Sequence, residues 1–199
     1  MINKKRKTVL ISVFNKRGIS KFAKILESLG YKIIATEGTG KELVKNRIPY
    51  ISAQKISKNP KGLEDCIKTI SFQIEAGILF DRLNPKHIKR VKKLGIEKID
   101  IVVCNLVNFK KVIKKPADFN IKNIDVGGPL MIRAAATNFK YVLVVVDPND
   151  YEKVVKAILG DKITDKFRQE LSTKAFNYTR SYDQTIVKYL KNTTPAKNV

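Results

Sequence analysis

Apolar runs alternate with amphipathic segments along this 199-residue chain. Runs of strand length, such as Thr8 to Ser12 and Ile99 to Asn105, predict buried β-strands. In Ile19 to Leu29 the apolar residues recur every three or four positions, which predicts a helix. The alternation is typical of a three-layer α/β fold whose mainly parallel sheet is flanked by helices. We expect further strands at Lys32 to Ala35, Gly77 to Phe80 and Val142 to Val146, and further helices at Gly40 to Asn46, Pro85 to Leu94, Gly128 to Thr137, Asn149 to Leu159 and Thr164 to Tyr189.

Length and composition predict one domain. With 43% hydrophobic residues, the chain can bury a single full core. We expect a domain over residues 1–160, a C-terminal helical extension of it over 161–190, and a disordered tail over 191–199. No segment has the length and pattern of a membrane span or a signal peptide, so we expect no membrane contact and a cytoplasmic protein.

The cysteine and histidine content excludes several kinds of site. Cys66 and Cys104 have no metal-ligand spacing and need not pair, which fits a reducing compartment. His87 is the only histidine and begins a predicted surface helix. We therefore expect no zinc site, no other metal site and no histidine-dependent triad.

The formal charge of +22 raises the question of nucleic-acid binding. The cations are 32 Lys and 8 Arg, spread over the whole chain without interleaved aromatic residues. This pattern does not favour specific recognition of nucleic acid, although non-specific binding to polyanions is expected. A basic field also steers phosphorylated small molecules toward a cleft.

An acid and two glycines precede a predicted helix in the stretch from Asp125 to Asn138 (DVGGPLMIRAAATN). Gly127 and Gly128 allow a ligand to approach the backbone, while the N–H groups of the first turn attract anionic or polar oxygens. The stretch therefore predicts a ligand site with a positioned carboxylate. A glycine pair at this place is also compatible with a tight turn.

Two loops that follow predicted strands carry hydroxyl groups, glycines and a lysine. Because ligands gather at the carboxyl ends of parallel strands, these loops could form a phosphate cradle. Taken alone, they are more typical of simple turns and helix caps, and they contain no Walker loop. The residues concerned are Ser12, Lys16, Gly18, Thr36, Gly38 and Thr39.

The Asp125 stretch resembles the signature D-I-G-G-P-x-M-x-R-A-A-A-K-N of the IMP cyclohydrolase family, the N-terminal half of a bifunctional purine biosynthesis enzyme. The resemblance covers roughly residues 7 to 190. It implies a methylglyoxal-synthase-like fold, a purine-pathway nucleotide as substrate and no cofactor. It leaves open a homodimer and a complex with a separate formyltransferase. Because the transformylase half has no counterpart here, we expect a stand-alone cyclohydrolase-type module. Segments that match the family in order are VLISVFNKRGI from Val9, ATEGTGKEL from Ala35, IDIVVCNLVNF from Ile99, VLVVVDPNDY from Val142 and Leu171 to Leu190.

The resemblance also implies roles for individual residues. The family holds the ribose phosphate with segments that match the two loops above, and Gly127 and Gly128 would add backbone N–H groups. Lys68, Thr69, Asn105 and Asp125 would form the catalytic machinery. In this hypothesis Lys68 stabilises the developing oxyanion and Asp125 takes or orients a proton.

Several positions depart from the family pattern. Two of them are positions that the family uses chemically, a tyrosine that is Val107 here and a lysine that is Thr137. The others lie in one segment, where Cys66, Ser71, Phe72, Glu75 and Ala76 replace arginine, histidine, proline, histidine and glycine.

Three interpretations are therefore compatible with the sequence. The first is an IMP cyclohydrolase-like enzyme with an altered site. The second is a catalytically impaired nucleotide- or phosphate-binding module of the same fold, and the third is a basic RNA-associated protein. A methylglyoxal synthase is disfavoured because the chain lacks the histidines of that enzyme.

Overall fold

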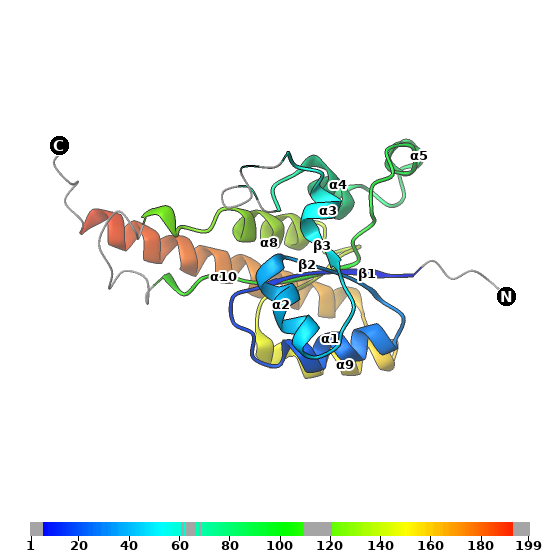
Figure 1. Ribbon diagram of the computed structural model, residues 1–199, viewed down its shortest axis with the longest axis horizontal. Helices are drawn as coiled ribbons and strands as arrows, with labels where there is room; N and C mark the ends of the chain where they lie inside the picture. Colours follow the sequence, from blue (N-terminus) through cyan, green and yellow to red (C-terminus); the bar gives the residue numbers. More distant parts are fainter. Residues whose placement is uncertain (1–5, 61, 63–66, 68, 110–120, 193–199) are drawn as a thin grey trace.

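A parallel β-sheet forms the centre of the molecule (Figure 1). The structure, a computed structural model, describes residues 6–60, 62, 67, 69–109 and 121–192. In this part of the chain the sheet has five strands in the order β3-β2-β1-β4-β5, and every neighbouring pair is parallel. The strands are β1 (Thr8–Val13), β2 (Lys32–Ala35), β3 (Ile51–Ser52), β4 (Ile101–Asn105) and β5 (Leu143–Val145).

The central strands are buried on both faces, as expected for a sheet covered by helices on each side. All five residues of β4 are buried, and in β1 only Ser12 is partly exposed. This explains why both strands read as continuous apolar runs in the sequence rather than as alternating patterns. Burial of apolar area on this scale is the main stabilising contribution to the fold.

Helices cover both faces of the sheet, which confirms the three-layer α/β prediction (Figure 1). Helices α1 (Ile19–Ser28) and α9 (Tyr151–Leu159) lie on one face, where the rings of Phe22 and Tyr151 stack with their centroids 4.5 Å apart. On the other face, α8 (Gly127–Thr137) packs against α4 (Phe72–Leu79) and α10 (Asp165–Lys191), and α10 also packs on β5. The remaining helical elements are α2 (Glu37–Lys45), α3 (Ala53–Ser57), α5 (Pro85–Lys93) and the 3-10 turn η1 (Pro148–Asp150).

Most predicted elements are present, but the strand expected at Gly77 to Phe80 is wrong. This segment is the end of helix α4, which starts at a cap where the Ser71 hydroxyl accepts the N–H of Ile74 at 3.1 Å. A Cβ at Gly77 would lie 2.3 Å from the carbonyl oxygen of Glu97, so the helix passes close to the chain that leads into β4. Such close packing requires glycine and is not visible in the apolar pattern.

Other elements also differ from the predictions. Helix α2 begins at Glu37 rather than at Gly40, and the short elements β3 and α3 were not predicted. The C-terminal segment is one helix that ends at Lys191, and its N-cap Thr164 accepts the N–H of Phe167 at 3.2 Å. Of the tail predicted for 191–199, residues 193–199 lie outside the described part of the chain.

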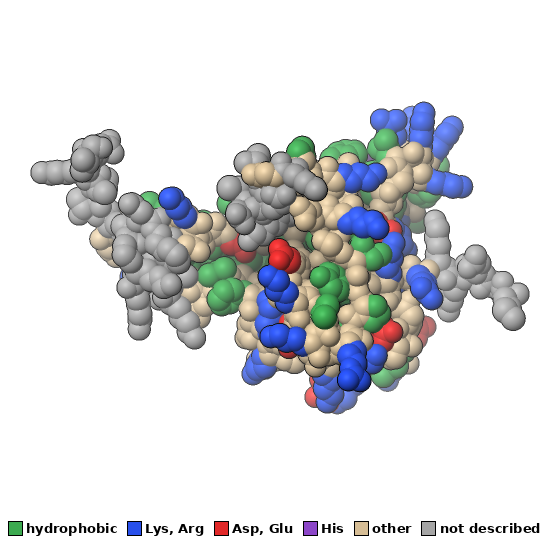
Figure 2. Space-filling view, in the orientation of Figure 1, with side chains coloured by type: hydrophobic (Ala, Val, Ile, Leu, Met, Phe, Trp, Pro, Cys, Tyr) green, Lys and Arg blue, Asp and Glu red, His purple; other side chains and the backbone are tan. Residues whose placement is uncertain are grey.

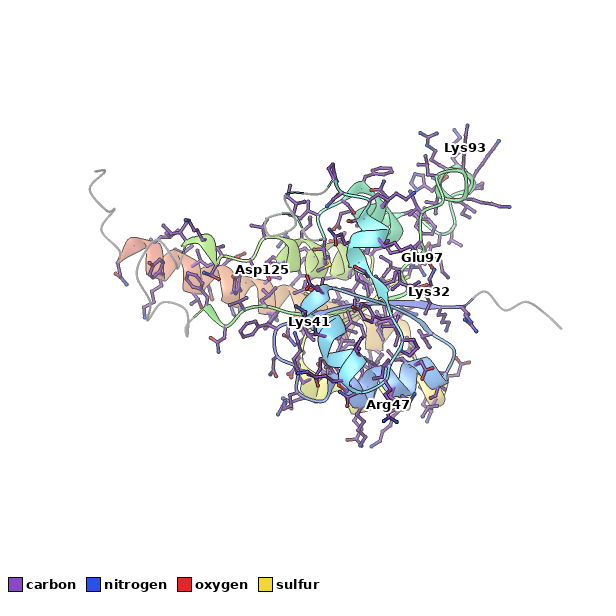
Figure 3. All side chains as sticks on the ribbon, in the orientation of Figure 1. Lys32, Lys41, Arg47, Lys93, Glu97 and Asp125 are labelled. Carbon is purple, nitrogen blue, oxygen red and sulfur yellow. The ribbon has the colours of Figure 1, made fainter. Side chains whose placement is uncertain are left out.

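Charged side chains at the amino end of the sheet are paired with one another. Glu97 accepts hydrogen bonds from Lys32 at 2.6 Å and from the Thr8 hydroxyl at 2.9 Å (Figure 3). Asp100 pairs with Arg82 at 2.7 Å and accepts the Thr8 N–H at 2.9 Å. These groups fix the start of β1 and β4, so the ligand-binding potential of the sheet lies at its other end.

No helix in the described part of the chain is both long and apolar enough to cross a membrane.

Candidate functional site

The strand order creates a crevice at the carboxyl ends of β1 and β4. The chain starts with β1 in the middle of the sheet, adds β2 and β3 on one side, and then crosses to add β4 and β5 on the other. Val13 at the end of β1 is in register with Asn105 at the end of β4. In open parallel sheets this kind of switch point is where ligands bind, because the loops that follow the two strands diverge there.

Three hydroxyl groups meet at the end of β1 and the start of α2. The Thr36 hydroxyl lies 3.3 Å from that of Ser12 and 3.4 Å from that of Thr39, and Thr39 accepts the N–H of Val13 at 3.0 Å. Gly38 lies in the first turn of α2, and its N–H has no partner among the described residues. A Cβ at Gly38 would meet nothing within 4 Å. The predicted phosphate loops thus come together around open space at a helix N-terminus.

Lys16 and Gly18 hold the loop after β1. The ammonium group of Lys16 donates to the carbonyl oxygen of Val13, and burial lowers the pKa of this lysine. Gly18 has a φ of +71° and is the N-cap of α1, so its place in the sequence is explained by the turn. Lys16 therefore borders the crevice, whereas Gly18 serves the geometry of the loop.

Asn105 joins the loops after β1 and β4. Its side-chain oxygen accepts the N–H of Asn15 at 2.7 Å, and its side-chain nitrogen donates to the carbonyl oxygen of Asn15 at 3.1 Å. Both ends of this buried amide are therefore engaged with backbone. The observed contacts give Asn105 a role in holding the crevice, and the catalytic role stays a prediction.

Asp125 lies just before α8 and caps that helix (Figure 3). Its Oδ1 atom accepts the N–H of Gly128 at 2.9 Å, and its own N–H donates to the hydroxyl oxygen of Tyr182 at 2.8 Å. Among the residues that the structure describes, none donates a hydrogen bond to Oδ2. The N–H of Gly128 is therefore engaged with Asp125, and the role predicted for Gly127 and Gly128 in binding a ligand stays a prediction.

Thr69 lies next to this helix N-terminus. It is buried, and a Cβ at Gly127 would come within 2.8 Å of its hydroxyl oxygen. Leu106 and Cys104 connect the region to β4, since a Cβ at Gly128 would lie 2.5 Å from Leu106 Cδ2 and the thiol of Cys104 lies 3.9 Å from the Gly128 carbonyl oxygen. Burial raises the pKa of the Cys104 thiol, so it is not an activated nucleophile. Lys68 and Cys66 lie outside the described residues.

A cleft of about 940 Å³ opens at the carboxyl ends of β1 and β4, and of the predicted site residues only Lys16 and Asn105 line it. Lys16, Asn105 and Val107 line it from the strand ends, and α10 forms the opposite wall. Tyr178 and Tyr182 of α10 lie in this wall, and neither was predicted from the sequence. Their spacing of four residues on a helix is a signal that they share a face, but it does not indicate what that face contacts. A smaller cavity of about 540 Å³, between Arg133 and the far side of α10, contains none of the predicted site residues.

The two chemically used positions that depart from the family pattern lie in different places. Val107 lines the cleft. Thr137 is the last residue of α8, about 15 Å along the helix axis from Gly127, and is exposed. The substitution at Thr137 thus removes no group that stands beside Asp125. Among the described residues, no group of three or more His, Cys, Asp or Glu is placed to hold a metal ion.

The fold and the site define a class: a three-layer α/β protein with a polar crevice at the carboxyl ends of its parallel strands. The chain belongs to the MGS-like domain family, which matches residues 18–140. Residues 135–199 also match the AICARFT/IMPCHase bienzyme family. These matches confirm the resemblance seen in the sequence.

Individual relatives agree with the family assignment. The bifunctional purine biosynthesis protein PurH of Caldicellulosiruptor saccharolyticus is 46% identical over 190 residues, which cover 93% of this chain and 37% of that protein. PurH of Staphylococcus carnosus is 40% identical over 188 residues, covering 93% of this chain and 38% of that protein. The crystal structure of ForH is similar with a TM-score of 0.79 and 28% identity, covering 94% of this chain and 99% of that one. The chain therefore spans little more than a third of the length of the curated relatives.

Proposed function

We propose that this protein is an IMP cyclohydrolase, which closes a formamido-imidazole-carboxamide ribotide to inosine monophosphate. The observation that carries the proposal is the carboxylate of Asp125, which is fixed by the N–H of Gly128 and by Tyr182, while its Oδ2 atom has no hydrogen-bond partner among the described residues. Asp125 lies just before α8, where Gly128 packs closely against Leu106 at the end of β4. The matches to the bienzyme family and to PurH support this choice.

Ring closure needs proximity and proton transfer. The amide nitrogen of the substrate attacks the formyl carbon of the same molecule, the nitrogen loses a proton, and water leaves. Holding the two groups face to face gives effective molarities that reach roughly 10⁵–10⁸ M in well-aligned cases. A placed proton acceptor adds about 10²–10⁴-fold, and in this proposal Oδ2 of Asp125 is that acceptor.

The loops after β1 and β2 would hold the phosphate of the ribotide. Ser12, Thr36 and Thr39 supply hydroxyl donors, and the N–H of Gly38 points from the first turn of α2. Lys16 adds a positive charge at the edge of the cleft. Hydrogen bonds to a charged group contribute about 1.5–3 kcal/mol each, which is enough to anchor the substrate while its reactive end faces Asp125.

The test is turnover of the formylated ribotide by the wild-type protein and by Asp125→Asn. Asparagine keeps a side-chain oxygen that can accept the Gly128 N–H, but it cannot take a proton. We expect the melting temperature to stay within about 2 °C, since the cap is retained, and kcat to fall about 10²–10⁴-fold. Asp161→Asn, the same change at an exposed residue beyond the end of α9, is the matched control.

Two other outcomes have a definite meaning. Equal turnover by wild type and Asp125→Asn would reject the role given to Asp125. Binding of inosine monophosphate by a wild-type protein that does not turn over would identify the impaired nucleotide-binding module instead.

The partner predictions extend the same proposal. A purine-pathway nucleotide would be the substrate, and a separate formyltransferase would supply it in formylated form. We also propose a homodimer, which the family resemblance implies, and a cytoplasmic location, which the sequence pattern predicts.

A further inference from the structure

One stripe of α10 that faces the cleft is polar. On a helix that packs against a domain, the face turned inward is normally apolar. Here residues at spacings of three and four line the cleft with amide, hydroxyl and ammonium groups. They are Lys174, Asn177, Tyr178, Ser181, Tyr182 and Thr185.

Two of these side chains accept hydrogen bonds from the backbone of the candidate site. The hydroxyl oxygen of Tyr178 accepts the N–H of Leu106 at 2.9 Å, and that of Tyr182 accepts the N–H of Asp125 at 2.8 Å. Leu106 directly follows Asn105 at the end of β4, and Asp125 precedes α8. One helix turn of α10 thus binds the two segments that carry the predicted catalytic residues, which are 72 and 57 residues away in the sequence.

We propose that Tyr178 and Tyr182 are positioning residues of the active site, which hold the end of β4 and the carboxylate of Asp125 at a fixed separation. This inference rests on the proposed cyclohydrolase function. Asp125 is constrained at two points, through its Oδ1 atom to Gly128 and through its N–H to Tyr182. A displacement of about 1 Å at a reacting group can cost 10²-fold in rate, so the second constraint matters for catalysis.

The ring of Tyr182 is fixed independently of its hydroxyl. It is 8% exposed and packs edge-on against Phe109, with ring centroids 6.3 Å apart. Helix α10 is also anchored elsewhere, because Ser172 donates to the carbonyl oxygen of Ala136 at 2.8 Å and Lys174 pairs with Asp147 at 2.7 Å. Replacing tyrosine by phenylalanine therefore removes one acceptor and leaves the helix in place.

The experiment compares wild type with Tyr178→Phe and Tyr182→Phe. Amide hydrogen exchange, resolved by residue, reports the N–H groups of Leu106 and Asp125, and steady-state kinetics with the formylated ribotide give kcat and KM. Tyr141→Phe is the control, because its hydroxyl donates to Asp81 at 3.2 Å near α5 and away from the cleft.

We expect faster exchange at Asp125 in Tyr182→Phe and at Leu106 in Tyr178→Phe, with both unchanged in the control. In Tyr182→Phe, kcat should fall about tenfold or more, while KM stays within about threefold because the phosphate loops are untouched. A purely structural role would lower stability without this split between kcat and KM.

The outcomes that overturn the inference differ from those that overturn the function. Unchanged exchange, or faster exchange with wild-type kcat, would reject the positioning role while the cyclohydrolase function stands. If the wild type gives no turnover, the proposed function fails. Hydrogen exchange then decides the inference, since faster exchange at Asp125 in Tyr182→Phe supports it and unchanged exchange rejects it.

Discussion

Asp125 and Gly128 fit together so closely that a side chain at residue 128 would displace the carboxylate. The N–H of Gly128 donates to Asp125 Oδ1 at 2.9 Å, and a Cβ at Gly128 would lie 2.6 Å from Asp125 Oδ2. Such a separation is shorter than real Cβ atoms show, so the carboxylate would have to move. The glycine thus sets the position of the group that we assign as proton acceptor.

Gly128→Ala should therefore affect catalysis more than folding. Displacement of the carboxylate should lower kcat about 100-fold, and overpacking against Leu106 should cost about 1–3 kcal/mol in the free energy of unfolding. Turnover and chemical denaturation measure the two effects. A variant with full activity would mean that the carboxylate position is not important for the reaction.

Gly38→Ala should have the opposite effect on stability. Its Cβ would meet nothing within 4 Å, and the residue lies in the first turn of α2. Alanine is the better helix former, so the free energy of unfolding should rise by about 0.5 kcal/mol. The added methyl group would enter the space proposed for the phosphate, and KM should rise about tenfold, equal to about 1.4 kcal/mol of lost binding.

Calorimetry and steady-state kinetics check this pair of effects. A stabilised variant with unchanged KM would place the phosphate away from α2.

The strands could be predicted from the sequence because burial on both faces makes them continuous apolar runs. β1 and β4 were predicted for this reason, whereas β3, with two half-exposed residues, has too little pattern to identify. Helix α4 was taken in part for a strand because its sequence, FQIEAGIL, has no polar stripe. Only its cap at Ser71 and its packing against the chain near Glu97 decide the conformation.

The candidate site also has features that could be predicted from the sequence and features that could not. The acid and glycines of the Asp125 stretch could be predicted, because a helix N-terminus and its capping carboxylate are neighbours in the sequence. The contacts of Tyr178 and Tyr182 could not, since they depend on where α10 docks. The hydrogen bond from the Gly128 N–H to Asp125 Oδ1 is likewise known only from the geometry.

We expect Glu75 to give the free energy of unfolding of the protein an unusual dependence on pH. Its carboxylate oxygens are buried without a recorded partner among the described residues, and burial raises the pKa to about 7 from 4.5. Between these values the folded state keeps a proton that the unfolded state has lost, so stability falls as pH rises from about 4.5 to 7.

Glu75→Gln removes this titration while keeping the size of the side chain. It should equal the wild type near pH 4 and exceed it by about 1–2 kcal/mol at pH 8, after allowance for solvent screening. Urea denaturation of both proteins at the two pH values is the measurement. A constant difference across this range would show that Glu75 keeps an ordinary pKa.

Helix α5 predicts where non-specific binding to polyanions is strongest. Lys and Arg side chains gather over it in Figure 2, and Lys93 points outward from it in Figure 3. None of its residues is buried, and within the described part of the chain none of its cations forms an ion pair. By contrast, surface lysines such as Lys41 and Lys156 are paired with acids one turn away. The cations of α5 are Lys86, Lys89, Arg90, Lys92 and Lys93.

Unpaired cations release more counterions when they meet phosphates, so replacing four of these lysines should weaken binding to poly(U) most. Each phosphate contact contributes about 0.7 to the slope of log affinity against log salt for a single strand, so a variant with four glutamines should lose up to about 3 from that slope.

The control replaces four paired lysines by glutamine and leaves the same net charge. Fluorescence titration at several salt concentrations separates the variants. Equal losses in both would mean that the net charge of the whole molecule, rather than α5, attracts the polyanion. The changed lysines are Lys86, Lys89, Lys92 and Lys93 in the α5 variant, and Lys24, Lys41, Lys153 and Lys156 in the control.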